Sequence, residues 1–137
     1  NELVLNASLG SWNSNRLALD GSYNFTDDTS ILAVAVTQNS DSYLDRYKTE
    51  KDIFYVFLEH QLSENTEISL SHSYSDSKAN GNGWGANPLF YTDGSATNYD
   101  RATNTSANWT NWDIKKQNTV FEITHILFME HQIKPLS

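Results

Sequence analysis

The chain of 137 residues contains no cysteine, which excludes disulfide bonds and thiolate metal sites. Its 9 basic residues are outnumbered by 17 acidic ones and form no cluster. Because nucleic acids are bound through grouped positive charges, this balance argues against a nucleic-acid partner. Only 38% of residues are hydrophobic, and without an apolar run of about 18 residues no transmembrane helix is predicted. Residues 1–25 also lack the basic start and apolar stretch of a signal peptide.

Apolar residues instead recur at every second position along most of the chain, which is the pattern of half-buried β-strands. In 66–75, Ile68 and Leu70 alternate with Ser69 and Ser71. The segment 30–38 is apolar at nearly every position, so periodicity does not assign its faces. We predict six strands, separated by connections at 13–15, 26–29, 40–50, 63–65 and about 76–112.

After the first turn, short and long connections alternate, as they do at the two ends of an up-and-down antiparallel meander. Short turns on one side, longer loops on the other and strands of about ten residues are typical of transmembrane β-barrels. A strand of that length, at roughly 3.3 Å per residue and a tilt of about 40°, rises about 25 Å, which matches the apolar band of such barrels. A soluble β-sandwich gives similar alternation.

Two further features favour the barrel. The aromatic residues Tyr23, Phe25, Phe54 and Tyr74 lie near strand ends, where an interfacial girdle is expected. The polar sides of the strands carry side chains suited to a wet lumen. We predict that the lumen-facing set is Asn6, Ser8, Asp20, Ser22, Glu59, Ser69, Ser71 and Glu122, and that the lipid-facing set is Leu3, Leu5, Leu9, Leu17, Leu19, Leu58, Ile68, Leu70, Phe121 and Ile123.

The long predicted loop contains "GNGWGANPLFYTDG" (81–94), which carries four glycines together with large apolar side chains that are costly to expose, Trp84, Leu89, Phe90 and Tyr91. Together with its flanks, the loop resembles the early barrel region of TonB-dependent ferric-siderophore receptors. The resemblance covers about residues 3–127. It rests on several motifs in order: Ser42-Tyr43-Leu44-Asp45, Trp84-Gly85, Pro88-Leu89, Tyr91, Asp93-Gly94, Arg101, and the pair Trp109 and Trp112.

This resemblance implies a 22-stranded barrel filled by an N-terminal plug. Residues 1–137 then form part of that barrel, without the plug and the remaining strands, and 76–112 is an extracellular loop. The implied location is the outer membrane of a Gram-negative bacterium, and the implied partners are a ferric siderophore, outer-membrane lipid and, through the absent plug, TonB. The implied function is ferric-siderophore uptake energised through TonB. No cofactor is expected, because the siderophore itself holds the iron.

The implied ligand-binding residues are an aromatic wall and one cationic donor. Alternatively, the aromatic side chains pack against one another to hold a large loop together. A second function is a soluble all-β carbohydrate-binding module whose aromatic loop stacks on sugars. No catalytic residues are predicted and an enzyme is not expected; the four histidines, including His131, lack a zinc spacing. The candidate siderophore-binding residues are Trp84, Phe90, Tyr91, Tyr99, Arg101, Trp109 and Trp112.

Overall fold

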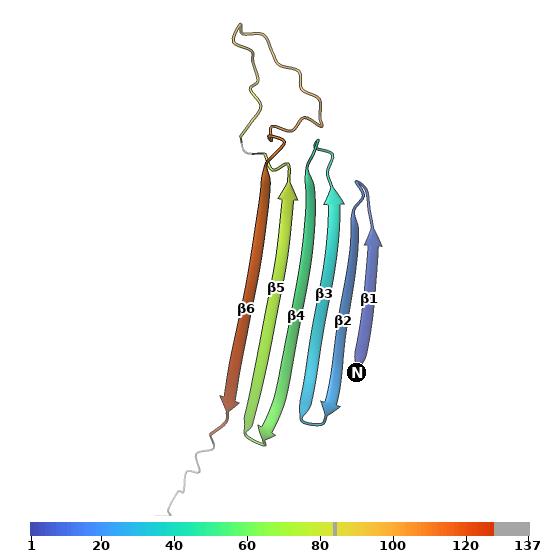
Figure 1. The fold of residues 1–137 in the computed structure, drawn as a ribbon, viewed down its shortest axis with the longest axis vertical. Coiled ribbons are helices and arrows are strands. Elements are labelled where there is room, and N and C mark those ends of the chain that lie inside the picture. Colours follow the sequence, from blue (N-terminus) through green and yellow to red (C-terminus); the bar gives the residue numbers. More distant parts are fainter. Residues whose placement is uncertain (84, 128–137) are drawn as a thin grey trace, which may run out of the picture.

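The computed structural model, which describes residues 1–83 and 85–127, contains one six-stranded antiparallel sheet (Figure 1). Each strand pairs with the next one along the chain, so the order is β1-β2-β3-β4-β5-β6. This confirms the predicted all-β up-and-down meander of six strands. The strands are β1 (Glu2–Leu9), β2 (Asn15–Thr26), β3 (Thr29–Asp41), β4 (Lys48–Ser63), β5 (Thr66–Asn80) and β6 (Asn111–His125).

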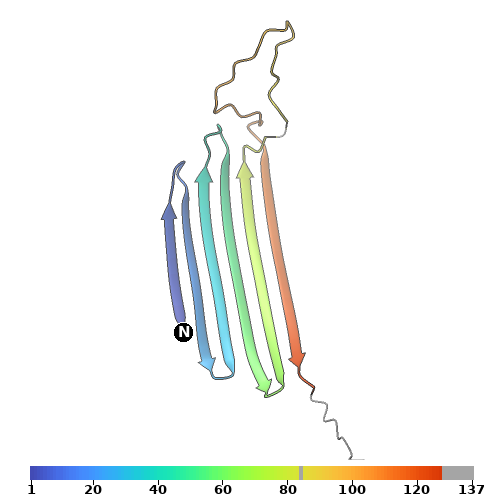
Figure 2. The same cartoon turned by 180° about the vertical axis from the view of Figure 1, so that it is seen from behind.

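The connections differ strongly between the two ends of the sheet (Figures 1 and 2). Tight turns join β2 to β3 and β4 to β5 at one end, whereas the other end carries the connections 10–14, 42–47 and 81–110. The longest connection is shorter than the predicted 76–112, because β5 and β6 remain paired through the polar residues 76–80 and 111–115. There Asp76 pairs with Lys115 and Lys78 with Asp113, so opposite charges on neighbouring strands continue the ladder where alternation of apolar residues has ended.

The strand register places the two predicted sets of residues on opposite faces of the sheet. Leu58 pairs with Leu70, which pairs with Phe121, while the neighbouring row joins Glu59, Ser69 and Glu122. Because side chains alternate between faces, every second row belongs to the same side. We call the side of Leu70 the apolar face and the side of Ser71 the polar face.

The register also assigns the residues of 30–38 to the two faces, which the periodicity of the sequence did not do. Ile31, Ala33 and Ala35 of β3 lie on the apolar face, in rows with Leu58, Val56 and Phe54 of β4. The alternate residues of β3 lie on the polar face and form an apolar patch there with β4. Its members are Leu32, Val34, Val36, Ile53, Tyr55 and Phe57.

Toward the end of the sheet with the long connections, the apolar residues of this face stop at a different height on each strand, so their limit runs obliquely across the rows of paired residues. It reaches Leu9 on β1, whereas the first apolar residue of this face on β6 is Phe121. The row of Phe121 meets β1 about eight residues below Leu9, which is roughly 26 Å along the strands. Over five strand spacings of about 4.8 Å this slope is about 45°. Strands that cross a membrane at a tilt need such a slope to keep their apolar band level, and transmembrane barrel strands tilt by about 35–45°.

Three histidines lie on the apolar face, and each is paired with a threonine of the adjacent strand. Nδ1 of His72 lies 2.7 Å from Oγ1 of Thr119. The corresponding distance is 2.8 Å for His60 with Thr29 and for His125 with Thr66. Each pairing gives one ring nitrogen a polar partner on the apolar face, where other polar groups are few.

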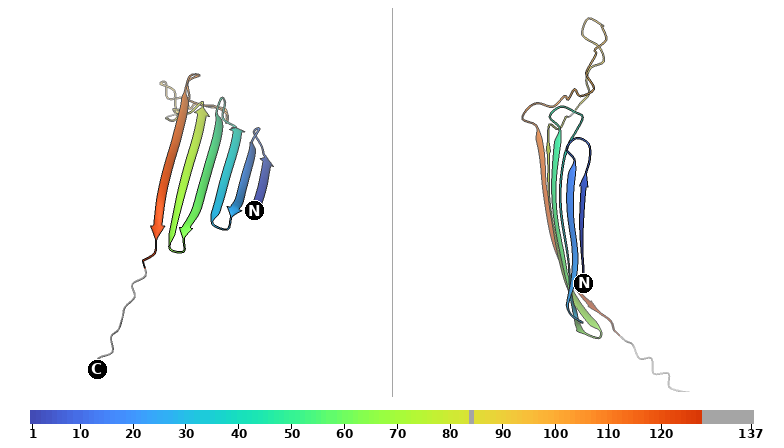
Figure 3. Two further views of the ribbon diagram at one scale, coloured as in Figure 1. Left: turned by 60° about the horizontal axis from the view of Figure 1, so that its bottom comes forward. Right: turned by 90° about the vertical axis from the view of Figure 1, so that its right-hand side faces the viewer.

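The sheet is a single curved layer, as the edge-on view shows (Figure 3). Among the described residues, Ala18 is the only apolar residue that is buried. The leucines of the apolar face are exposed, with Leu3 at 73% and Leu9 at 90%. No second sheet covers them within residues 1–83 and 85–127, so the isolated segment lacks the core of a soluble β-sandwich. The same residues include no helix that is long and apolar enough to cross a membrane.

Candidate ligand-binding site

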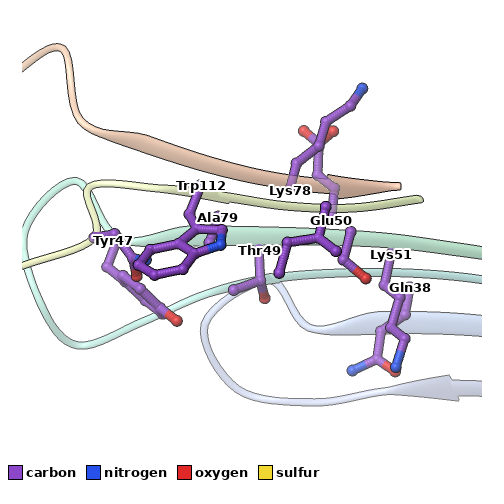
Figure 4. Close-up of a pocket in the computed structure, with 11 residues that line it drawn as sticks. Gln38, Tyr47, Thr49, Glu50, Lys51, Lys78, Ala79 and Trp112 are labelled. Carbon is purple, nitrogen blue, oxygen red and sulfur yellow. The ribbon is translucent and has the colours of Figure 1, made fainter. Parts of the chain in front are cut away.

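A pocket of about 480 Å³ lies at the end of the sheet that carries the long connections (Figure 4). Its floor is built from two neighbouring rows of the polar face. One row joins Gln38, Lys51, Ser77 and Ile114, and the next joins Thr49, Ala79 and Trp112. The other lining residues are Tyr47, Glu50, Lys78 and Asn82.

The pocket combines aromatic, cationic and amide groups. In Figure 4 the rings of Trp112 and Tyr47 lie at one end, and the side chains of Lys51 and Gln38 lie at the other. Small residues on β5, Ser77 and Ala79, leave space between the two ends. Such a site can hold a ligand with a flat apolar part and several oxygen acceptors, because the rings offer faces for stacking while Lys51 and Gln38 donate hydrogen bonds.

Of the predicted ligand-binding residues, the structure brings Trp112 into this pocket. Trp109 lines a different cleft, with Arg46 and Asn108, and is 83% exposed. Tyr99 is 41% exposed. Trp84 lies outside the described residues. The assignment of these residues to a siderophore site stays a prediction.

Arg101 joins the long connection to the two other connections at the same end. Its guanidinium carbon lies 5.2 Å from the ring centroid of Tyr43, which is the range of a cation–π interaction. The Tyr43 ring is in turn 6.2 Å from that of Trp12 in the first turn. These contacts give Arg101 a role in holding three connections together, which is independent of any ligand.

Phe90 and Tyr91 lie in a small hairpin within the long connection. Phe90 pairs with Ala96, and the Tyr91 amide donates to the Ser95 carbonyl at 2.8 Å. Both aromatic side chains are about three-fifths exposed, at 62% and 60%. Neither belongs to the lining of the pocket described above.

Asp93 closes the turn of this hairpin. Its Oδ1 accepts hydrogen bonds from the Ser95 hydroxyl at 2.6 Å and from the Ser95 amide at 2.9 Å, and these bonds hold the pKa of the Asp93 carboxyl below its usual value. The stabilisation is therefore present above the unfolded-state pKa and is lost as pH falls through the lowered value. We expect the protection of the Ser95 amide against hydrogen exchange to fall as pH drops through the lowered pKa of Asp93. Asp93→Asn keeps an oxygen acceptor without the titrating group, so its protection should not show this acid-dependent loss. Identical pH profiles for the two proteins would contradict the assignment.

Sequence reasoning missed Tyr47, Lys51 and Gln38. Each sits in locally unremarkable sequence. The row that links Gln38, Lys51 and Ser77 brings Gln38 and Lys51 to the pocket, and Tyr47 reaches it from the 42–47 connection. Among the described residues, no group of three histidines, aspartates or glutamates is placed to hold a metal ion.

The exposed apolar face, the oblique limit of that face and the pocket at the loop end define a segment of a transmembrane β-barrel receptor. Comparison with known proteins identifies the kind of receptor. The Ferripyoverdine receptor of Pseudomonas aeruginosa is 33% identical over 107 residues, which is 76% of this chain and 13% of that protein. The Ferric-pyoverdine 358 receptor of Pseudomonas putida is 28% identical over 132 residues, or 95% of this chain and 16% of that protein. No family model matches the sequence.

Solved structures agree with the sequence relatives. The chain superposes on the crystal structure of the ferripyoverdine receptor of the outer membrane of P. aeruginosa bound to ferripyoverdine with a TM-score of 0.82. The two aligned sequences are 29% identical, and the alignment covers 88% of this chain and 16% of the other. FpvA of P. aeruginosa bound to heterologous pyoverdines gives a TM-score of 0.84 at 28% identity over 91% of this chain and 17% of that one. The chain belongs to the TonB-dependent ferric-siderophore receptors of the bacterial outer membrane, as one part of their barrel. It spans only 13–17% of the length of these relatives, whose names describe them as receptors.

Proposed function

We propose that this chain forms six neighbouring strands of an outer-membrane receptor and one wall of its binding site for a ferric siderophore of the pyoverdine class. Its apolar face contacts lipid and its polar face lines the lumen. Uptake is energised through TonB by way of a plug that lies outside residues 1–137. The 81–110 connection is extracellular. The segment performs no catalysis, because the chelate is bound whole and the siderophore keeps the iron.

The observation that carries this proposal is the position of the pocket. It opens on the polar face, at the end of the sheet with the long connections. In a closed barrel that face points inward, so the pocket lies at the mouth of the lumen, where a ligand arrives from outside. Trp112 and Tyr47 stack on the flat part of the chelate, while Lys51 donates to its oxygen-rich shell. The names of the relatives supply the pyoverdine class.

Direct titration tests this function. A full-length receptor that carries this segment, purified in detergent, should quench its tryptophan fluorescence saturably with ferric pyoverdine. Ferrichrome, a hydroxamate chelate of a different shape, should bind more weakly. Absence of saturable binding of ferric pyoverdine would overturn the proposal.

The carbohydrate-binding alternative gains no support from the relatives, which are siderophore receptors. Its requirement for a soluble, covered core also conflicts with the uncovered apolar face. The same titration with cellohexaose and chitohexaose separates the two functions, and we expect no fluorescence change with either sugar.

A further inference from the structure

Two side chains fasten the 81–110 connection to the 42–47 connection. The Arg46 guanidinium donates from Nη2 to the carbonyls of Asn104 and Ser106, at 3.2 and 2.7 Å, and from Nη1 to Oδ1 of Asn108. In the opposite direction, Nδ2 of Asn104 donates to the carbonyl of Asp45 at 2.7 Å, and within its own connection it also donates to the carbonyl of Gly81 at 2.8 Å. We call Arg46 and Asn104 the loop clasp. Each member reaches the backbone of the other's connection, so the two segments hold each other reciprocally.

The backbone at this point is shaped for the clasp. Arg46 has a φ of 65°, in the left-handed region that costs a residue with a side chain about 1 kcal/mol or more. Glycine would adopt this conformation without that cost, but glycine could not reach the three acceptors. Opposite it, a Cβ on Gly81 would lie 2.4 Å from the Arg46 carbonyl oxygen, so only glycine allows this approach. An arginine held in this conformation, opposite a position that only glycine can occupy, indicates that the close contact between the two connections has a function.

The clasp adjoins both aromatic residues of the pocket. Tyr47 follows Arg46 directly and precedes β4. On the other side, the Gly81 amide donates to the Thr110 carbonyl at 3.0 Å, which fixes the chain just before Trp112. The relative position of the Tyr47 and Trp112 rings therefore depends on how these connections are joined.

We propose that Arg46 and Asn104 are positioning residues, which preset the distance between the two aromatic residues of the pocket before a ligand binds. This proposal rests on the proposed siderophore-binding function and adds the residues that organise the site. A wall that is ordered in advance loses less conformational entropy on binding, so the clasp raises affinity without touching the ligand. Loss of the clasp should therefore weaken binding and loosen the 81–110 connection together.

The sequence offers a specific readout of loosening. Arg101 is the only lysine or arginine between Lys78 and Lys115, so tryptic cleavage there reports opening of the 81–110 connection. In a full-length receptor that carries this segment, Arg46→Ala should speed cleavage after Arg101, without ligand, by about tenfold. The same variant should weaken binding of ferric pyoverdine by about tenfold. Gly81→Ala should give both effects, and the double variant should be no worse than the more impaired single variant.

The matched control is Lys48→Ala. It also removes one positive charge and one tryptic site beside the 42–47 connection, but its ion pair with Asp41 is a 3.6 Å surface contact, and both readouts should stay at the wild-type level. An unchanged cleavage rate in Arg46→Ala would overturn the clasp. Faster cleavage with unchanged affinity would overturn the positioning role and show that Arg46 only holds the two connections together. A wild-type receptor that binds no ferric pyoverdine would overturn the proposed function. The cleavage rates would still test whether Arg46 holds the 81–110 connection in place.

Discussion

Replacing Leu70 by lysine is expected to destabilise the membrane-inserted receptor by about 2–4 kcal/mol, the cost of a lysine facing lipid near the middle of the bilayer. Leu70 lies on the apolar face in a row with Leu58 and Phe121, so an ammonium group there has only apolar neighbours within its row. The measurement is the urea midpoint for unfolding from phospholipid vesicles, followed by the shift between folded and unfolded bands on a gel.

The control for this substitution is the preceding residue of the chain. Ser69→Lys changes the polar face, where its row contains Glu59 and Glu122 as acidic neighbours for the new charge, so its midpoint should move far less. Equal losses in the two variants would show that β5 does not separate lipid from water, and would contradict the assignment of the two faces.

Trp112→Ala is expected to weaken binding of ferric pyoverdine to a full-length receptor by about 2 kcal/mol, or roughly 30-fold, because tryptophan is enriched among the few residues that carry most of the binding energy at a binding site. Trp112 shares the pocket with Tyr47 and is the predicted aromatic residue that the structure places there. Fluorescence titration of the variant against the parent receptor measures the change.

Trp109→Ala is the matched comparison, because it removes the same side chain from the neighbouring cleft. Its loss of affinity should be several-fold smaller. Tyr91→Ala extends the test to the hairpin, where a loss as large as that of Trp112→Ala would show that the hairpin folds onto the ligand. If Trp109→Ala proved the more damaging of the two tryptophan variants, the binding site would lie at the outer cleft instead.

The fold was largely predictable from the sequence, for a local reason. Alternation along a strand can be seen in consecutive residues. In β5 the alternation of Ile68 and Leu70 with Ser69 and Ser71 is enough to assign two faces. The limits of that reasoning appear where both sides of a strand are apolar, as in β3, or both are polar, as beyond Asp76. In each case the pairing partner on the next strand decides the outcome.

The candidate site was less predictable. The ordered motifs around 81–112 indicate the family, and they point to Trp112, but they also point to Arg101 and Tyr91, which lie outside the pocket lining. Nothing in the local sequence of Tyr47 or Lys51 signals a binding role. The place of Lys51 in the pocket follows from the register of four strands, and that of Tyr47 from the connection just before β4.

The amino-acid sequence is enough to predict the period of two, the six strands, the unequal connections and the kinship with siderophore receptors, because each of these is carried by neighbouring residues or by motifs in order. Four features required the folded sheet: the faces of residues 30–38, the tilt of the apolar band, the lining of the pocket and the clasp. The clasp shows the reason most directly. Arg46 bonds to residues 58 to 62 positions away, and such a contact depends on strand register and on one left-handed backbone angle.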